Sequence, residues 1–259
     1  MSEKVIQNPV AKEAPGVDIK IFKHHVSTRI MHLLVALGFI VCGVSGILLF
    51  AGAPIPRGAI ALIHCIMGVV FIGAPVVYIV VSWRSFSRFM DTCTHYDKDD
   101  LGWITAPMGG YLDPYLFRGK PEHYVPPQDK YNTGQKLAGL CLILGGVGLA
   151  ITGFLMWANT GDGIFGLIRV DMGPGMTWFI WTLHFVACVL MLLVFAVHFF
   201  LGAVYPVTNV EFGTMFGNGI ADYAYTKKKH GKWLEEMELV EEHEVADAGD
   251  KKPAGASAE

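Results

Sequence analysis

Charged residues are scarce in this chain. Asp, Glu, Lys and Arg make up 17% of its 259 residues, whereas about a quarter is usual in soluble domains. The five cysteines include no C-x-x-C pair, so the sequence indicates neither a covalent c-type haem site nor a site for an iron–sulfur cluster. These absences exclude a soluble enzyme, a nucleic-acid-binding protein, a disulfide scaffold and a disordered chain.

The charges that are present avoid four long apolar windows. These windows contain no Asp, Glu, Lys or Arg and comprise Ile30–Pro56, Gly58–Trp83, Leu137–Gly161 and Met172–Val210. About 20 apolar residues suffice for one helix to cross a bilayer, and a crossing segment must satisfy its backbone polar groups internally. We therefore predict an all-α integral membrane protein built as a four-helix bundle.

The basic residues predict how this bundle is oriented. Eighteen of the 20 Lys and Arg lie in residues 1–29, 84–136 and 205–259, and only Arg57 and Arg169 lie in the other two connections. Basic residues are enriched in cytoplasmic segments, so both termini are expected in the cytoplasm. The predicted domains are a cytoplasmic arm (1–29), a membrane domain (30–204, with a cytoplasmic connection over 82–136) and a cytoplasmic tail (205–259).

Four histidines fall inside the apolar windows, at positions 32, 64, 184 and 198. His184 and His198 are fourteen residues apart, which in a helix is about 21 Å of rise and nearly four full turns, so both face the same side. Given the predicted topology, His32 matches the depth of His198 near the cytoplasm, and His64 matches His184 near the outer surface. Ionisable residues at membrane depth are candidates for function.

Two imidazoles on facing helices can hold the iron of a haem from both sides. Helical bundles commonly build cofactor sites in their cores, and two axial imidazoles leave no position for oxygen or substrate, so electron transfer is the indicated chemistry. Zinc or copper would need further ligands that the windows lack. For any single histidine, an interhelical hydrogen bond is an alternative explanation.

Glycines recur where a macrocycle would need space. Gly46 lies fourteen residues after His32, and Gly139, Gly146 and Gly153 recur every seven residues in the third window. Their placement favours clearance for haem. Close helix packing through small residues, which is common in membranes, explains each glycine equally well.

Over about residues 20–236 the chain resembles the cytochrome b (gamma) subunit of respiratory formate dehydrogenases, in the group shared with nickel–iron hydrogenase cytochrome b subunits. The four histidines and the stretch Arg29-Ile30-Met31-His32 carry the group resemblance. Tyr131-Asn132-Thr133-Gly134-Gln135-Lys136 and His230-Gly231-Lys232-Trp233 favour the formate dehydrogenase branch. The longer connection and the longer acidic tail depart from the family pattern.

The resemblance implies two b-type haems and a quinone. His32 and His198 would ligate the inner haem iron, and His64 and His184 the outer one. A quinone, menaquinone or ubiquinone, would be reduced on the cytoplasmic side close to Asn132, Gly134 and Gln135. A helix-capping turn is the alternative role for this stretch, because Asn132 suits an N-cap.

The resemblance also implies partners and a location. The chain would be a multi-pass subunit of the bacterial cytoplasmic (inner) membrane, in contact with lipid. It would accept electrons from an iron–sulfur (beta) subunit, and a molybdenum- or tungsten-containing (alpha) subunit would oxidise formate. This chain would therefore contain the quinone site of the complex but not its formate-oxidising centre.

Two alternatives remain open from the sequence. The electron donor could be a nickel–iron hydrogenase or another quinone-linked reductase. Alternatively, the chain could be a haem-free transporter or anchor whose histidines relay protons. The colour of the purified protein distinguishes the haem-free alternative from the others.

Overall fold

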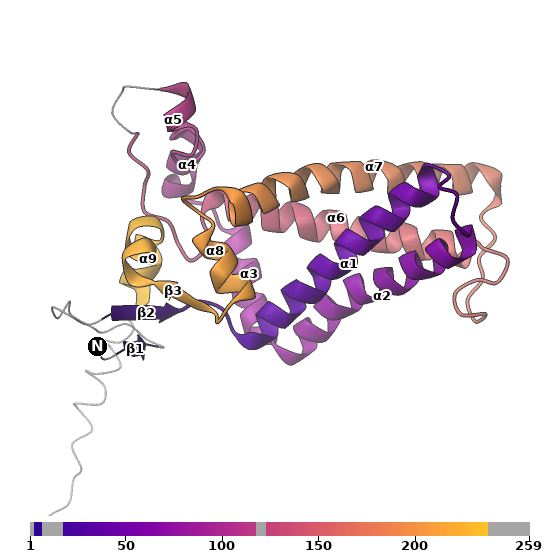
Figure 1. Cartoon of the computed structure of the whole chain (residues 1–259), viewed down its shortest axis with the longest axis horizontal. Coiled ribbons are helices and arrows are strands. Elements are labelled where there is room, and N and C mark those ends of the chain that lie inside the picture. Colours follow the sequence, from indigo (N-terminus) through magenta and orange to yellow (C-terminus); the bar gives the residue numbers. More distant parts are fainter. Residues whose placement is uncertain (1–2, 7–17, 118–122, 238–259) are drawn as a thin grey trace, which may run out of the picture. The chain divides into compact units, whose positions relative to one another are not determined.

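The structure is a computed structural model that describes residues 3–6, 18–117 and 123–237 (Figure 1). The chain divides into two compact units. The bundle unit comprises residues 25–95 and 135–216, and the sheet unit comprises residues 1–24, 96–134 and 217–259.

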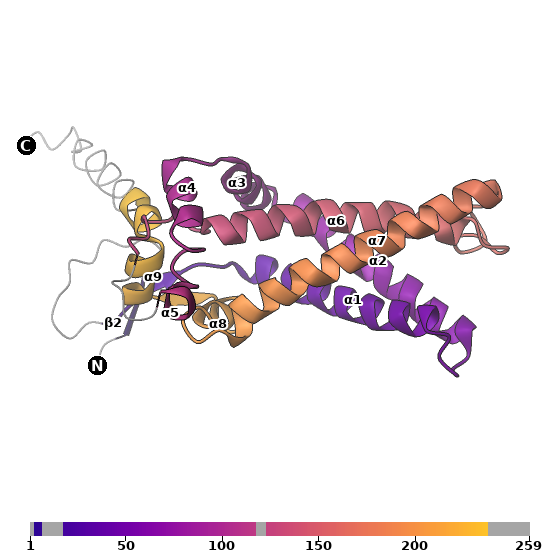
Figure 2. The same cartoon turned by 90° about the horizontal axis from the view of Figure 1, so that it is seen from above.

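Four long helices form the bundle unit, and each contains one of the apolar windows almost entirely. They are α1 (Val26–Phe50), α2 (Arg57–Val81), α6 (Thr133–Ala158) and α7 (Gly173–Phe199), the last continued by the π-helix η1 (Phe200–Val204). All four are long and apolar enough to cross a membrane. The turn between α1 and α2 and the loop between α6 and α7 lie at the same end of this unit (Figures 1 and 2). The four predicted spans are therefore confirmed.

Side chains of all four helices contact one another at mid-length in one layer. We call this layer the waist; its members are Gly38, Phe39, Phe71, Gly145, Gly146, Met191 and Phe195. A Cβ added to Gly38 would lie 2.9 Å from the Cβ and 3.0 Å from the Cα of Phe71, so α1 and α2 approach closely here. A Cβ on Gly145 would overlap the sulfur of Met191, and the rings of Phe39 and Phe195 are 5.0 Å apart. Small residues thus allow close helix contact at mid-length.

Shorter helices complete the end of the bundle unit where α1 begins. Helix α3 (Trp83–Thr94) follows α2, and Phe89 on it lies 3.1 Å from the position of a Cβ on Gly139 of α6. Helix α8 (Val210–Phe216) follows η1 and packs against α1. Burial raises the pKa of the Cys93 thiol on α3 to about 11, so this cysteine is a packing residue in its protonated form.

The sheet unit contains strands, which the all-α prediction missed. The strands are β1 (Glu3–Ile6), β2 (Asp18–Phe22) and β3 (Ile220–Asp222) in the order β1-β2-β3, parallel and then antiparallel. Ile21 pairs with Ala221 in the register and packs with Trp233 and Leu234. The strands have three to five residues and are joined across the length of the chain, so local periodicity gives little sign of them.

The connection and the tail contribute to both units. Helices α4 (Lys98–Thr105), α5 (Asp113–Leu116) and α9 (Tyr223–Lys229) lie in the sheet unit, and residues 231–237 are helical. The connection over 82–136 is therefore divided, because α3 lies in the bundle unit. Residues 7–17 of the predicted arm and 238–259 of the predicted tail lie outside the described residues.

Candidate functional site

The four histidines of the spans face one another in two pairs within the bundle unit. His32 of α1 and His198 of α7 have ring centroids 6.2 Å apart, with 49° between the ring planes. His64 of α2 and His184 of α7 have centroids 6.3 Å apart and an angle of 67°. The pairing predicted from depth and helical spacing is the pairing observed.

The spacing within each pair suits one metal between two imidazoles. Two metal–nitrogen bonds of about 2 Å, with ~1 Å from each nitrogen to its ring centre, place the two centroids about 6 Å apart. Among the described residues, no group of three or more His, Cys, Asp or Glu side chains is arranged to hold a metal ion. The donor set therefore fits a metal whose remaining ligands come from a macrocycle, as in haem.

Buried hydroxyl groups orient both rings of the His64/His184 pair. Ser45 Oγ lies 2.9 Å from His64 Nδ1, and Thr152 Oγ1 lies 2.8 Å from His184 Nδ1. Ser45 and Thr152 are 5% and 3% exposed, so these contacts are shielded from water. Because both Nδ1 atoms are engaged by these contacts, the nitrogens available to a metal are the Nε2 atoms.

Glycines let the helices approach these two rings. A Cβ on Gly46 would lie 3.4 Å from His64 Cε1, and one on Gly153 would lie 3.4 Å from His184 Cε1. Glycine at these two positions makes room for the imidazole rings, and clearance for a haem stays a prediction. Gly139 instead faces Phe89, and Gly146 faces Phe71, so these two glycines serve helix packing.

The surroundings of the His32/His198 pair are different. Phe216 of α8 meets His32 edge-on at 5.3 Å, and Arg29 donates a hydrogen bond to the carbonyl oxygen of Met215. His32 Nδ1 is buried and has no hydrogen-bond partner in the described part of the chain. An orphaned buried nitrogen is unusual, and here it belongs to one of the paired rings.

The waist separates the two histidine pairs along the bundle. Phe39 lies seven residues after His32 and contacts both Phe71 and Phe195. Phe39 and Met191 are 8% and 4% exposed, although most of the side chains on these helices are open at the surface of the unit. The bundle therefore contains two separate levels, each centred on one imidazole pair.

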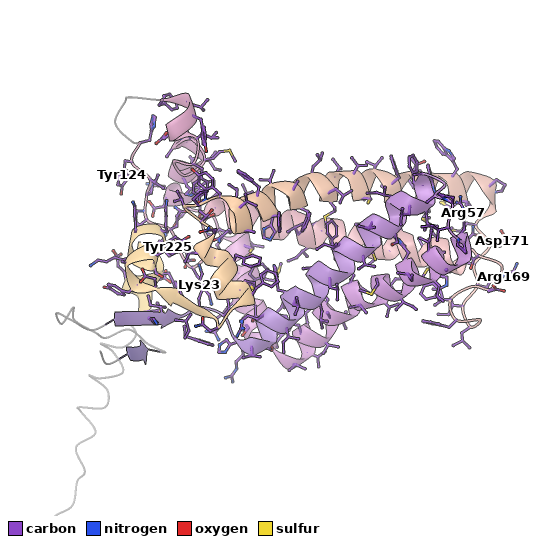
Figure 3. All side chains as sticks on the ribbon, in the orientation of Figure 1. Lys23, Arg57, Tyr124, Arg169, Asp171 and Tyr225 are labelled. Carbon is purple, nitrogen blue, oxygen red and sulfur yellow. The ribbon has the colours of Figure 1, made fainter. Side chains whose placement is uncertain are left out.

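Polar side chains lie at the end of the bundle that holds the two short connections. Arg57, Arg169 and Asp171 are all at this end (Figure 3). Arg57 and Arg169 are the only basic residues outside the three segments rich in Lys and Arg. The His64/His184 pair is the pair nearer this end, because His64 is in the second turn of α2.

The residues predicted to contact quinone are divided between the two units. Asn132 and Gly134 belong to the sheet unit, and Gln135 belongs to the bundle unit. Asn132 donates a hydrogen bond to the hydroxyl of Tyr111, and a Cβ on Gly134 would lie 2.7 Å from Trp103. Gly134 is thus required for packing whether or not a quinone binds. At the start of α6, the Thr133 amide donates to the side chain of Gln128.

The rest of the sheet unit contains a buried polar contact. Lys23 and His230 are 2% and 1% exposed, with Lys23 Nζ 3.3 Å from His230 Nε2. His230 Nδ1 donates to the carbonyl oxygen of Asp129 at 2.7 Å. The stretch His230-Gly231-Lys232-Trp233 is therefore part of the folded unit, with Trp233 in its core.

Sequence reasoning missed Ser45, Thr152 and the aromatic members of the waist. A weak signal was present: a hydroxyl residue directly precedes a glycine in Ser45-Gly46 and again in Thr152-Gly153. Hydroxyl residues inside apolar helices usually bond to the carbonyl four residues earlier, so the pattern alone indicates no second partner.

Four apolar helices with two levels of facing imidazoles define a membrane bundle of the redox-cofactor class. The comparison with family models agrees with this class: the model for prokaryotic cytochrome b561 matches residues 23–218. The chain belongs to the prokaryotic cytochrome b561 family. It is a multi-pass membrane protein with b-type haem, and it acts as the electron-transfer subunit of a redox enzyme. No curated protein matches the chain closely enough to count as a relative.

Proposed function

We propose that this chain is the dihaem cytochrome b subunit of a respiratory formate dehydrogenase. His32 and His198 would hold one b-type haem, and His64 and His184 would hold the second. When bound, each haem supplies reversible one-electron transfer. One observation carries this proposal: the four imidazoles face one another in two pairs.

The surroundings of the pairs support two haems over one. Both pairs have the spacing that one metal between two imidazoles requires, and the waist separates them. The family implies b-type haem, which argues against the haem-free transporter or anchor. Two levels placed along the membrane normal would let the subunit carry electrons between its two surfaces.

The direction and the acceptor follow from the charge distribution and the resemblance. The segments rich in Lys and Arg would be cytoplasmic, which places His32/His198 on the cytoplasmic side of the inner membrane. Electrons from an iron–sulfur subunit would enter at the His64/His184 end and reduce menaquinone or ubiquinone at the cytoplasmic side. Moving one charge across 100 mV costs about 2.3 kcal/mol, so turnover stores redox energy in the membrane potential.

The residues that favour the formate dehydrogenase branch are folded into the sheet unit. His230 and Trp233 are buried, and Asn132 and Gly134 pack against Tyr111 and Trp103. The connection and the tail therefore fold together in the sheet unit. The same family includes hydrogenase-type cytochrome b subunits, so a nickel–iron hydrogenase is the second candidate donor.

Haem counting on a histidine variant tests the ligand assignment. The purified chain should contain two b-type haems, and His198→Ala should leave one and abolish quinone reduction, because half of one axial pair is gone. His95→Ala is the matched control, since His95 is exposed on a polar segment outside the spans. Two haems in His198→Ala, or one haem in the unaltered chain, would refute the assignment.

Substrate-driven reduction in membranes tests the donor. Membranes containing the native complex should show a reduced b-type absorption band within seconds of adding formate, and purification through a tag on this chain should recover molybdenum or tungsten. Reduction by hydrogen and recovery of nickel would instead assign the chain to a hydrogenase. Reduction by neither, with the haems intact under dithionite, would reject both donors.

A further inference from the structure

The hydrogen bonds around Ser45 reveal which nitrogen of His64 carries the proton. Ser45 Oγ lies 2.6 Å from the carbonyl oxygen of Val41 as well as 2.9 Å from His64 Nδ1. A carbonyl oxygen can only accept, so the single hydroxyl proton is directed to Val41. The hydroxyl oxygen must then accept from His64, whose proton is on Nδ1. This leaves the lone pair of His64 on Nε2, the nitrogen available to a metal.

The same arrangement occurs at His184, on a different pair of helices. Thr152 Oγ1 lies 2.7 Å from the carbonyl oxygen of Gly148, four residues earlier, and 2.8 Å from His184 Nδ1. By the same reasoning, Thr152 accepts from Nδ1–H of His184. Each hydroxyl residue is followed by the glycine that contacts the same ring, Gly46 or Gly153. Helices α1 and α6 therefore each present a hydroxyl–glycine pair to one imidazole.

We propose that Ser45 and Thr152 are positioning residues that hold His64 and His184 in the Nδ1–H tautomer and lower the midpoint potential of the haem bound there. The proposal rests on the proposed function, because it assumes a haem at this pair. A hydrogen bond from the second nitrogen fixes the orientation of a ligating imidazole and makes it more basic. A more basic ligand stabilises the oxidised, more positively charged iron.

Among the described residues, His32 has no hydroxyl partner equivalent to Ser45 or Thr152. His32 Nδ1 is buried without a partner in the described residues, so no such hydrogen bond strengthens its basicity. The haem at His64/His184 should therefore have the lower midpoint potential of the two. A difference of this sign would favour electron transfer from the His64/His184 end toward His32/His198, which is the direction that the proposed function requires.

A redox titration of hydroxyl variants tests this proposal. The variants are Ser45→Ala and Thr152→Val, and the two potentials are read from the visible absorption of the full-length protein. The lower-potential component is the one that His184→Ala loses. Each variant should keep two haems and shift this component alone by about tenfold in its redox equilibrium, which is about 59 mV upward for one electron. The low-spin electron paramagnetic resonance signal of the same haem should shift as well.

Conservative replacements and a matched threonine separate positioning from general structural damage. Ser45→Thr and Thr152→Ser keep the hydroxyl and should restore the original potential. Thr182→Val removes a hydroxyl that also bonds four residues back on α7, 2.9 Å from the carbonyl of Trp178, and should change neither potential.

The outcomes distinguish failure of this proposal from failure of the proposed function. Two haems with unchanged potentials in Ser45→Ala and Thr152→Val would overturn this proposal and leave the proposed function intact. Loss of a haem in Ser45→Ala that Ser45→Thr restores would support it. Loss in both Ser45 variants would overturn it, and a protein with no haem at this pair would reject the proposed function itself.

Discussion

The two histidine levels of the bundle use the same ligands in different surroundings. At one level, His64 and His184 each meet a buried hydroxyl and a glycine. At the other, His32 meets the edge of Phe216 and has a buried Nδ1 without a partner in the described residues. The ligand pairs have nearly equal spacing, so the difference lies in the groups behind the ligands.

Two pairs of the same histidine ligands can therefore form two chemically distinct sites. In a low-dielectric environment, a single hydrogen bond to a ligand has a larger electrostatic effect than it has in water. The waist keeps the levels apart, so a change behind one pair can act on that pair alone. Substitutions in the His64/His184 level, in the waist and in the sheet unit test how far this independence extends.

The largest effect is expected from a bulky residue at the His64/His184 level. Gly153→Val should remove one of the two haems, because its branched side chain would extend past the 3.4 Å contact with His184 Cε1 and displace the ring. Gly153→Ala is the graded control and should keep both haems, since its Cβ makes only ordinary van der Waals contact. Haem content per chain is the measurement, and loss of both haems in Gly153→Val would show that the levels are not independent.

A moderate effect is expected from a substitution in the waist. Gly38→Ala should lower the unfolding free energy by about 1–3 kcal/mol, the usual cost of overpacking, because its Cβ would meet the backbone of Phe71. Thermal unfolding in detergent, followed at both haem bands, should show the two levels destabilised together. A Cβ on Gly148 would have no neighbour within 4 Å, so Gly148→Ala should be neutral. Equal destabilisation by both variants would contradict close packing at the waist.

The smallest effect is expected in the sheet unit, where an ion pair responds to pH. The Lys232 ammonium beside Asp97 lowers the pKa of that carboxyl from 3.8 to about 2, and the carboxylate raises the pKa of Lys232. The Asp97 contribution is complete above pH 4 and is lost as pH falls from about 4 to 2. The Lys232 contribution is complete below its ordinary pKa and is lost as pH rises through the raised value.

Both side chains of this pair are partly exposed, so the contribution is at most about 1 kcal/mol. Asp97→Asn should remove the Asp97 part of the pH response, while Asp99 stays 3.6 Å from Lys232 Nζ, and should keep the capping of α4, in which Asp97 accepts from the amides of Asp99 and Asp100. Asp97→Ala should cost about 1 kcal/mol more, since it also removes the cap. Limited proteolysis of the sheet unit checks this, and altered haem potentials in Asp97→Asn would link the pair to the histidine levels.

Several features of the fold and site could be predicted from residue spacing. The fourteen-residue interval between His184 and His198 follows four helical turns, and charge-free windows locate the spans within a few residues. These predictions succeed because a membrane helix has a fixed rise and a fixed length, so position in the sequence translates directly into depth.

Other features depended on contacts between distant segments. Strand β2 pairs with β3 about two hundred residues later, and Ser45 reaches a histidine on another helix. Gly146 was expected to provide space for haem, yet it packs against Phe71 in the waist. Small residues serve both purposes equally well, so their spacing alone does not separate the two.

Four apolar helices of membrane-spanning length, and which of the four histidines could pair, were predictable from the order of the residues alone. Helical geometry and the exclusion of charge from lipid dictate these properties locally. Only the tertiary structure decided which atoms lie behind each imidazole, because rotation of neighbouring helices sets those contacts. The difference between the hydroxyl beside His184 and the His32 Nδ1, which has no hydrogen-bond partner among the described residues, arises from packing, and it would make the two levels unequal.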